Sequence, residues 1–249
     1  ERAYFSRTIT KKIKAINGLY GRAGGFIYGQ NEMIPERKEK AIKILKQIER
    51  NHRGQKILIS GSFLYNKKYN DIDVFVLSKY QKEDYQQGEL HFNHLSSEAA
   101  DSLFFLSLSK VCVTNFSLDF LPLKEKIDLK ELVSKYQEVI KDDVDKNSSW
   151  LKIDLREFIL VCYYAGSGMV LSSKELSRIS ESLAKKKRIA FLLKNLFVQT
   201  LLQGFNKKMI FPLGLKMIKS YRELKKEYKQ SEYYNFLIRS FQEVLAYAG

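Results

Sequence analysis

Two aspartates, Asp71 and Asp73, stand two positions apart at the start of an apolar run. Successive side chains of a β-strand point to opposite faces, so both carboxylates are expected to project from one face. Two like charges so close together are unfavourable unless a cation neutralises them, and Mg²⁺ typically binds one or two carboxylates together with substrate phosphates. The pair therefore predicts a site for Mg²⁺ or Mn²⁺. The structural alternative is a strand cap and a surface acid.

A glycine and a serine, Gly61 and Ser62, directly follow the apolar run Lys56–Ser60, and eight residues separate them from the first of these aspartates. Glycine allows a sharp turn and a close approach of the backbone to a ligand. Serine offers a hydroxyl and a backbone N–H to a phosphate oxygen. The two residues predict a phosphate-binding turn, and Lys67 and Lys68 in the spacer are further candidates for phosphate contacts.

A third carboxylate would allow two metal ions to be held about 3.5–4 Å apart and would deprotonate an attacking hydroxyl in an in-line displacement. Asp119 is the candidate, because apolar residues flank it in a predicted strand, where an acid without a partner or a purpose is costly. The alternatives are an ion pair between Asp119 and a lysine of the helical region, or a third acid supplied by Glu89, Asp84 or Asp101.

Other residues of the metal-binding type form weaker patterns. His91 and His94 have near-helical spacing, but they lack a companion Cys or a third His, so we do not expect a histidine ligand pair. Cys112 and Cys162 lie in apolar runs and are expected to be buried, reduced thiols. Two cysteines are too few for a paired zinc site.

The elements around these residues indicate a small α/β unit. They are a helix from Pro35 to Gly54, strands at Lys56–Ser60 and Ile72–Leu77, a serine-capped helix over 96–110, and one or two strands within Val111–Leu121. Residues 1–34 are basic and glycine-rich, which favours a loop or hairpin arm over a domain. The chain begins with Glu1 rather than Met, and we expect that native N-terminal sequence precedes it.

From about Asp128 onward the pattern is helical only. Candidate helices span 129–146, 151–165, 173–184, 186–203, 214–229 and 232–247, with breaks at Gly166–Gly168 and Asn206–Pro212. We therefore predict an α/β (α+β) domain with a small mixed sheet over residues 35–125 and an all-α helical bundle over 126–249. The boundary is expected between Leu123 and Asp128.

The charge distribution favours a polyanionic partner. The 249 residues carry a formal net charge of +15, with +9 on residues 1–60, −3 on 61–123 and +9 on 124–249. Between Ala184 and Lys229 there are 13 Lys and Arg against 2 acids, interleaved with Phe191, Phe197, Phe205, Phe211 and Tyr221. Lysines that contact phosphates and aromatics that stack on bases predict RNA binding. For the aromatics, burial in the core of amphipathic helices is the favoured alternative.

The apolar runs are shorter than the roughly 18 residues that a membrane span needs. We therefore expect no membrane partner. The two cysteines in apolar runs favour a cytoplasmic location.

The strand, the Gly-Ser turn, the short spacer, the Asp-hydrophobic-Asp strand and the later strand acid resemble the nucleotidyltransferase superfamily related to DNA polymerase beta. Its members are enzymes that transfer a nucleoside monophosphate from a nucleoside triphosphate to a hydroxyl, using Mg²⁺ held by three acids. The resemblance implies that Gly61 and Ser62 bind the triphosphate. It also implies that Asp71, Asp73 and Asp119 are the metal ligands.

The resemblance covers roughly residues 36–122, and in this superfamily a helical part usually closes over the nucleotide. Candidates for contacts to the base and the triphosphate are Tyr163, Tyr164, Lys152 and Arg156. The chain most resembles stand-alone members that act as toxins of toxin–antitoxin or abortive-infection systems. This implies an RNA acceptor such as a tRNA 3′ end, and an antitoxin or another protein as a partner. The alternatives are nucleotidylation of a small molecule or a protein, and a catalytically silent nucleic-acid-binding protein.

Overall fold

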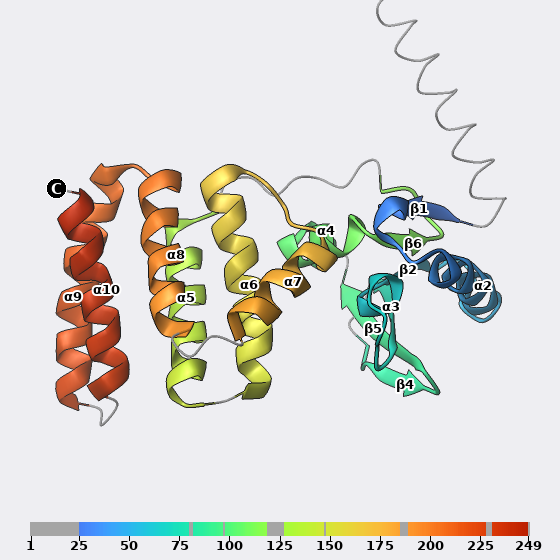
Figure 1. Ribbon diagram of the computed structural model, residues 1–249, viewed down its shortest axis with the longest axis horizontal. Helices are drawn as coiled ribbons and strands as arrows, with labels where there is room; N and C mark the ends of the chain where they lie inside the picture. Colours follow the sequence, from blue (N-terminus) through green and yellow to red (C-terminus); the bar gives the residue numbers. More distant parts are fainter. Residues whose placement is uncertain are drawn as a thin grey trace, which may run out of the picture. The chain divides into compact units, whose positions relative to one another are not determined.

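A computed structural model of the protein describes residues 25–79, 82–96, 98–118, 127–146, 148–184, 189–227 and 231–248. These residues form two compact units, each described by itself. The first contains the described residues up to 118 together with Ser172–Lys174, and the second contains the remainder. The first unit holds a mixed sheet and the second consists of helices (Figure 1), in agreement with the predicted class.

A sheet of six strands, in the order β1-β6-β2-β3-β5-β4, organises the first unit. The strands are β1 (Phe26–Tyr28), β2 (Lys56–Ser60), β3 (Ile72–Ser78), β4 (Tyr85–Gln87), β5 (Leu90–Ser96) and β6 (Cys112–Thr114). β3 pairs antiparallel with β2 on one side and parallel with β5 on the other. The starts of β3 and β5 therefore lie beside the end of β2.

Helices cover both faces of this sheet (Figure 1). They are η1 (Gln30–Glu32), α2 (Pro35–Asn51), α3 (Ser62–Tyr65), η2 (Glu98–Asp101) and α4 (Leu103–Ser109). On one face, Leu45 of α2 and Phe63 of α3 share a buried cluster with Val74 of β3. On the opposite face, Phe105 of α4 shares a second cluster with Phe75. The alternation of β3 thus assigns its odd-numbered residues to the α4 face.

One edge of the sheet differs from the sequence-based prediction. Phe26–Tyr28, expected in a separate arm of residues 1–34, form the edge strand β1 and pair with β6. Residues 1–24 of that arm lie outside the described part of the chain. One strand, β6, lies within Val111–Leu121, where one or two strands were expected; it ends at Thr114, and residues 119–121 lie outside the described part of the chain.

The side chain of Asn115 explains why β6 is short. Its Oδ1 accepts a hydrogen bond from the Ile57 N–H (2.8 Å), and its Nδ2 donates to the Gln55 carbonyl (2.9 Å). The side-chain amide therefore replaces the backbone groups that a continued strand would use.

The helix predicted over residues 96–110 is shorter than expected. Ser96 ends β5, and α4 begins only after Ser102, whose Oγ accepts a hydrogen bond from the Phe105 N–H (3.2 Å). β5 itself was not predicted. Leu90 and Phe92 alternate with His91 and Asn93 at its start, which is the pattern of a half-buried strand.

The second unit is built around stacked aromatic rings. Its helices are α5 (Leu129–Val144), α6 (Ser148–Ser167), α7 (Ser173–Ala184), α8 (Ile189–Gly204), α9 (Lys207–Glu227) and α10 (Ser231–Ala248). Tyr136 of α5 stacks on Phe197 of α8 with ring centroids 3.9 Å apart, and Phe241 of α10 meets Phe197 edge-on. The Tyr136 hydroxyl is buried against the Ser240 hydroxyl at 2.7 Å. Offset and edge contacts of this kind stabilise a core beyond simple burial.

The break predicted at Asn206–Pro212 is only partly present. α9 begins at Lys207 and continues through Pro212. Proline has no N–H to donate to the carbonyl four residues earlier, which here belongs to Lys208. Lys208 is an exposed residue near the start of the helix. The helix therefore tolerates this proline.

Both cysteines are free and buried, as expected, and burial raises the pKa of both thiols. Among the described residues, no helix combines the length and the apolar character needed to cross a membrane.

The residue before the Gly61 turn fixes the end of β2. Ser60 is fully buried, and its Oγ lies 3.1 Å from the Leu108 carbonyl oxygen and 2.8 Å from that of Val111. Ser60→Ala should lower the free energy of unfolding by about 1–2 kcal/mol, because the carbonyls of Leu108 and Val111 lose the buried Ser60 hydroxyl as a donor. Chemical denaturation measures the change. Ser109→Ala is the control, since its hydroxyl bonds only within its own helix; equal losses in the two variants would contradict this role for Ser60.

Candidate metal site

The turn after β2 brings the backbone against a carboxylate. Ser60 pairs with Asp73 in the β2–β3 ladder, so Gly61 is the first residue beyond that pair. Gly61 has φ 93°, in the left-handed region that favours glycine. A Cβ built on Gly61 would collide with Oδ2 of Asp73. Glycine is required here for both its conformation and its lack of a side chain.

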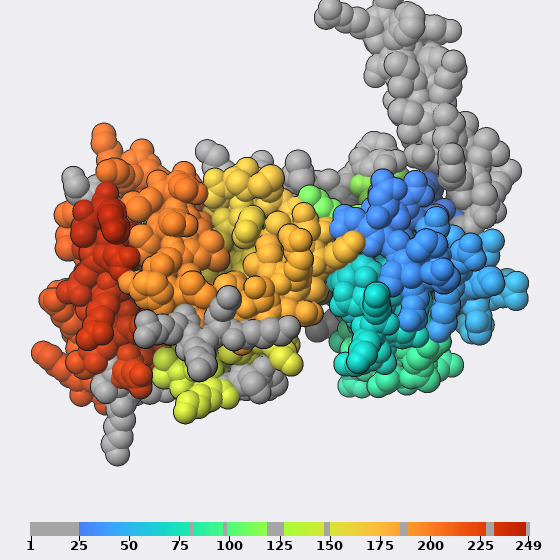
Figure 2. Space-filling view, in the orientation of Figure 1, coloured from blue at the N-terminus to red at the C-terminus, as the bar shows by residue number. Residues whose placement is uncertain are grey.

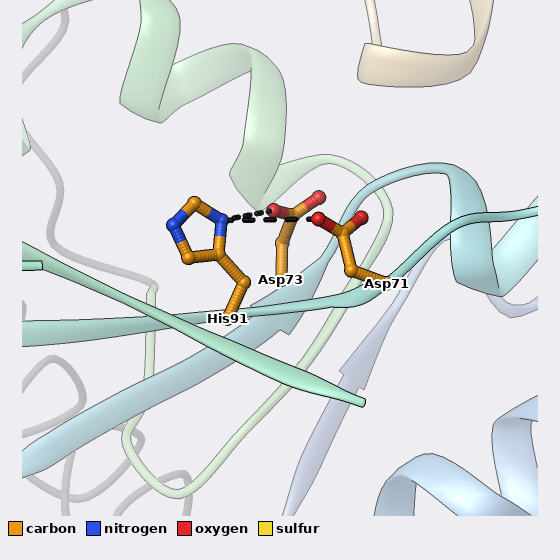
Figure 3. Close-up of side chains that lie close together, drawn as sticks. All are labelled: Asp71, Asp73 and His91. Carbon is orange, nitrogen blue, oxygen red and sulfur yellow. Dashed lines mark ion pairs between the residues drawn. The ribbon is translucent and has the colours of Figure 1, made fainter. Parts of the chain in front are cut away.

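Three side chains converge beside this turn (Figure 3). Asp71 precedes β3, Asp73 lies within it, and His91 is the register partner of Asp73 on β5. Nδ1 of His91 lies 3.7 Å from Oδ1 of Asp73 and 3.9 Å from Oδ2 of Asp71. The exposed fractions of the side chains are 38% for Asp71, 29% for Asp73 and 37% for His91. The prediction that the two aspartates share one face is confirmed.

The same face of β3 is apolar further along the strand. Phe75, two residues after Asp73, is only 5% exposed and belongs to the cluster beneath α4. Asp73 lies nearer the strand start and retains access to solvent. One strand therefore provides both an anchor in the core and an accessible carboxylate.

The other residues predicted for the site are Ser62, Lys67, Lys68 and Asp119, and the structure describes the first three. Ser62 is half-buried and begins α3, which is anchored by the buried Phe63. Lys67 and Lys68 are exposed in the segment between α3 and β3. Asp119 lies outside the described residues.

His91 is the residue that sequence reasoning missed. His91 and His94 were considered as a helical pair and set aside, whereas both lie on β5 and, three positions apart, face opposite sides of the strand. His94 stacks on Tyr85 (5.9 Å between centroids), and burial lowers its pKa. The polar His91 between apolar Leu90 and Phe92 was the available signal.

The three side chains fit a divalent cation. Each offers one ligand atom, two carboxylate oxygens and one imidazole nitrogen, and these atoms lie within 4.8 Å of one another. A cation among them would offset the repulsion between the carboxylates. Oδ2 of Asp73 lies close to the Gly61 backbone, whereas Oδ1 faces His91.

A second acidic cluster has a different character. Glu138, Asp154 and Glu157 of α5 and α6 also bring carboxylate oxygens together. Lys135, however, lies within the cluster, with Nζ 2.8 Å from Oε2 of Glu138 and 2.6 Å from Oε2 of Glu157. A resident ammonium group already supplies the positive charge, so we interpret this cluster as an ion-pair network between helices.

The residues expected to contact nucleotide from the helical region lie on α6. Lys152 and Arg156 are exposed, and Tyr163 and Tyr164 are half-buried. Tyr164 lines an open cavity of about 980 Å³ within the second unit, together with residues such as Phe205. The structure thus places Tyr164 at a cavity and the two basic residues on the surface.

The basic segment of the bundle, residues 184–229, includes helix α9, which carries a stripe of exposed residues. On α9, exposed residues recur every three or four positions, which places them on one helix face. They include Lys208, Phe211, Leu215, Lys219, Arg222 and Lys226; Lys216 and the acids Glu223 and Glu227 of the same helix are also exposed. Figure 2 shows α9 and α10, in orange to red, on the surface of the second unit.

The aromatics of this basic segment divide between core and surface. Phe197 and Tyr221 are buried, whereas Phe191 and Phe211 are exposed. The run of basic residues at 185–188 lies outside the described residues.

Comparison with family models, with curated proteins and with solved structures found no match to this chain.

Gly61→Ala should displace the Asp73 carboxylate and strain the backbone, because the new Cβ collides with it at a positive φ. We expect the free energy of unfolding to fall by about 1–3 kcal/mol and Mn²⁺ binding, measured by calorimetry, to weaken. Gly88→Ala is the matched control, since Gly88 also has a positive φ but a Cβ there would meet no atom within 4 Å. Unchanged Mn²⁺ binding by Gly61→Ala would refute the role of the turn.

The acidic cluster of α5 and α6 predicts a pH dependence of stability. Burial and the neighbouring carboxylates, chiefly Asp142, raise the pKa of Asp154 from 3.8 to about 6. The folded protein therefore favours the protonated form of Asp154. The stability that this carboxyl group contributes is full below about pH 4 and is lost as the pH rises through about 6. Asp154→Asn should melt at a higher temperature than wild type at about pH 7.5, with the difference vanishing near pH 4. A difference that is independent of pH would contradict this assignment.

Proposed function

We propose that the protein is a metal-dependent nucleotidyltransferase that transfers a nucleoside monophosphate from a nucleoside triphosphate to a hydroxyl at an RNA end. The observation that carries the proposal is the position of Asp71 and Asp73, on one face and directly beside the Gly61 turn. A carboxylate pair next to a close backbone turn offers both a cation site and a place for phosphate. The resemblance to polymerase beta-like nucleotidyltransferases rests on these same residues.

In this proposal the first unit binds the triphosphate. Gly61 and Ser62 contact phosphate oxygens through backbone N–H groups and the serine hydroxyl, and Lys67 and Lys68 add positive charge. A divalent cation, Mg²⁺ or Mn²⁺, would neutralise charge on the triphosphate and on the leaving pyrophosphate.

The transfer is an in-line displacement. The acceptor hydroxyl oxygen forms a bond to the α-phosphorus, and the bond from that phosphorus to the bridging oxygen of the β-phosphate breaks. Pyrophosphate leaves, and the hydroxyl proton passes to a base, for which Asp119 is the proposed residue. Asp71 and Asp73 orient the triphosphate through the cation they hold.

The second unit supplies the argument for RNA as the acceptor. The exposed stripe of α9 carries four basic residues, and Phe211 lies within it as a surface ring that an unpaired base can stack on. The buried residues of α9, Ile210 and Ile218 among them, occupy other positions of the helix, and every residue of the stripe is exposed. Basic residues aligned on a helix give salt-sensitive affinity for a phosphate backbone.

One observation favours a second candidate, a catalytically silent nucleic-acid-binding protein. The third side chain facing the aspartate pair is His91 rather than a carboxylate. The described residues beside the pair therefore differ from the three acids that the resemblance implies for an active transferase.

Each labelled nucleoside triphosphate incubated with the protein, divalent metal and total RNA should label an RNA band. Asp71→Ala or Asp73→Ala should reduce the transfer rate by about a thousandfold or more, because the triphosphate loses its metal-mediated orientation. Glu83→Ala, which removes an exposed acid of the same unit, is the control and should leave the rate unchanged.

Other outcomes separate the alternatives. Label on a protein or on a small molecule would replace RNA as the acceptor class. Salt-sensitive RNA binding without any transferred label would favour the silent nucleic-acid-binding protein. An undiminished rate in both aspartate variants would refute the proposed mechanism.

A further inference from the structure

The third ligand position of the site is occupied by a nitrogen donor. β3 and β5 pair in parallel with Asp73 opposite His91, so the imidazole is held beside the carboxylates by the backbone ladder. Figure 3 shows the Nδ1 atom of the His91 ring directed at both carboxylates.

The spacing suits coordination better than direct hydrogen bonding. Nδ1 lies 3.7 and 3.9 Å from the nearest oxygens of Asp73 and Asp71, longer than an ordinary hydrogen bond. Two ligand atoms bound to one ion at about 2.1 Å are roughly 3.0–3.4 Å apart in octahedral or tetrahedral geometry. The imidazole nitrogen therefore needs to approach each carboxylate oxygen by less than about 1 Å more.

The donor set discriminates between metals. Mg²⁺ is a hard ion that prefers oxygen ligands and gives up its water reluctantly. First-row transition ions bind imidazole nitrogen as well as carboxylate, and their affinity for a mixed site exceeds that of Mg²⁺. All three side chains retain partial exposure, so water or phosphate oxygens can complete the coordination shell.

We infer that Asp71, Asp73 and His91 form a mixed oxygen and nitrogen site that selects a first-row divalent transition ion over Mg²⁺. The inference names the metal of the site in the proposed function and rests on that proposal for the use of the metal in transfer. A site of three carboxylates, as the sequence predicted with Asp119, would show a weaker preference for the transition ion.

The test uses Mn²⁺ as the probe. Continuous-wave electron paramagnetic resonance measures bound Mn²⁺, and competition gives the affinity for Mg²⁺. Wild type should bind Mn²⁺ about tenfold or more tightly than Mg²⁺, and His91→Asp should reduce the ratio to about threefold or less while retaining Mg²⁺ binding. His94→Ala, on the opposite face of the same strand, is the matched control and should leave the ratio unchanged.

A direct readout needs no variant. Pulsed electron paramagnetic resonance of Mn²⁺-loaded wild type should detect coupling to one directly bound ¹⁴N nucleus. Absence of this coupling, equal affinity of wild type for the two ions, or no binding of either would overturn the inference. Metal selection with ¹⁴N coupling but no transferred label would refute the proposed function alone, whereas transfer with equal affinities would refute this inference alone.

Discussion

The hydrogen-bond register of β2, β3 and β5 is the constraint on which the candidate site depends. Ser60 opposite Asp73 places the Gly61 turn against a carboxylate, and Asp73 opposite His91 places the imidazole on the same side. A slip of one residue in either ladder would move a side chain to the other face of the sheet. The buried residues on both faces of β3, Val74 and Phe75 among them, make such a slip costly. The core thus specifies the geometry of the site.

The local features of the site were predictable because they depend on near neighbours in sequence. Asp71 and Asp73 share a face by strand periodicity alone, and β2 spans the predicted residues Lys56–Ser60. Gly61 was expected at a sharp turn, and it has the left-handed conformation that makes glycine necessary.

The partner across the sheet was not predictable in the same way. His91 reaches Asp73 through a parallel pairing of strands, and nothing in the local pattern fixes which strand pairs with β3. The short β6 depends on the Asn115 side chain binding the backbone near the start of β2, a contact across 58 residues of sequence. Pro212 was expected to lie in a break between helices, but it lies within α9, five residues after Lys207, where the helix begins.

The two units divide the chemistry that the proposed reaction needs. The sheet unit gathers acids and an imidazole at the start of β3, where a cation offsets the charge. The helical unit presents Lys219, Arg222 and neighbouring basic residues on an exposed face of α9. The basic face of α9 attracts a polyanionic acceptor, whereas the aspartates at the start of β3 would repel it in the absence of a metal ion.

Anomalous diffraction from crystals of the protein grown with Mn²⁺ tests the central claim most directly. We expect an anomalous peak about 2.0–2.3 Å from a carboxylate oxygen of Asp71, a carboxylate oxygen of Asp73 and Nδ1 of His91. A map in which these three side chains surround no metal, while Mn²⁺ is found bound elsewhere, would contradict the claim.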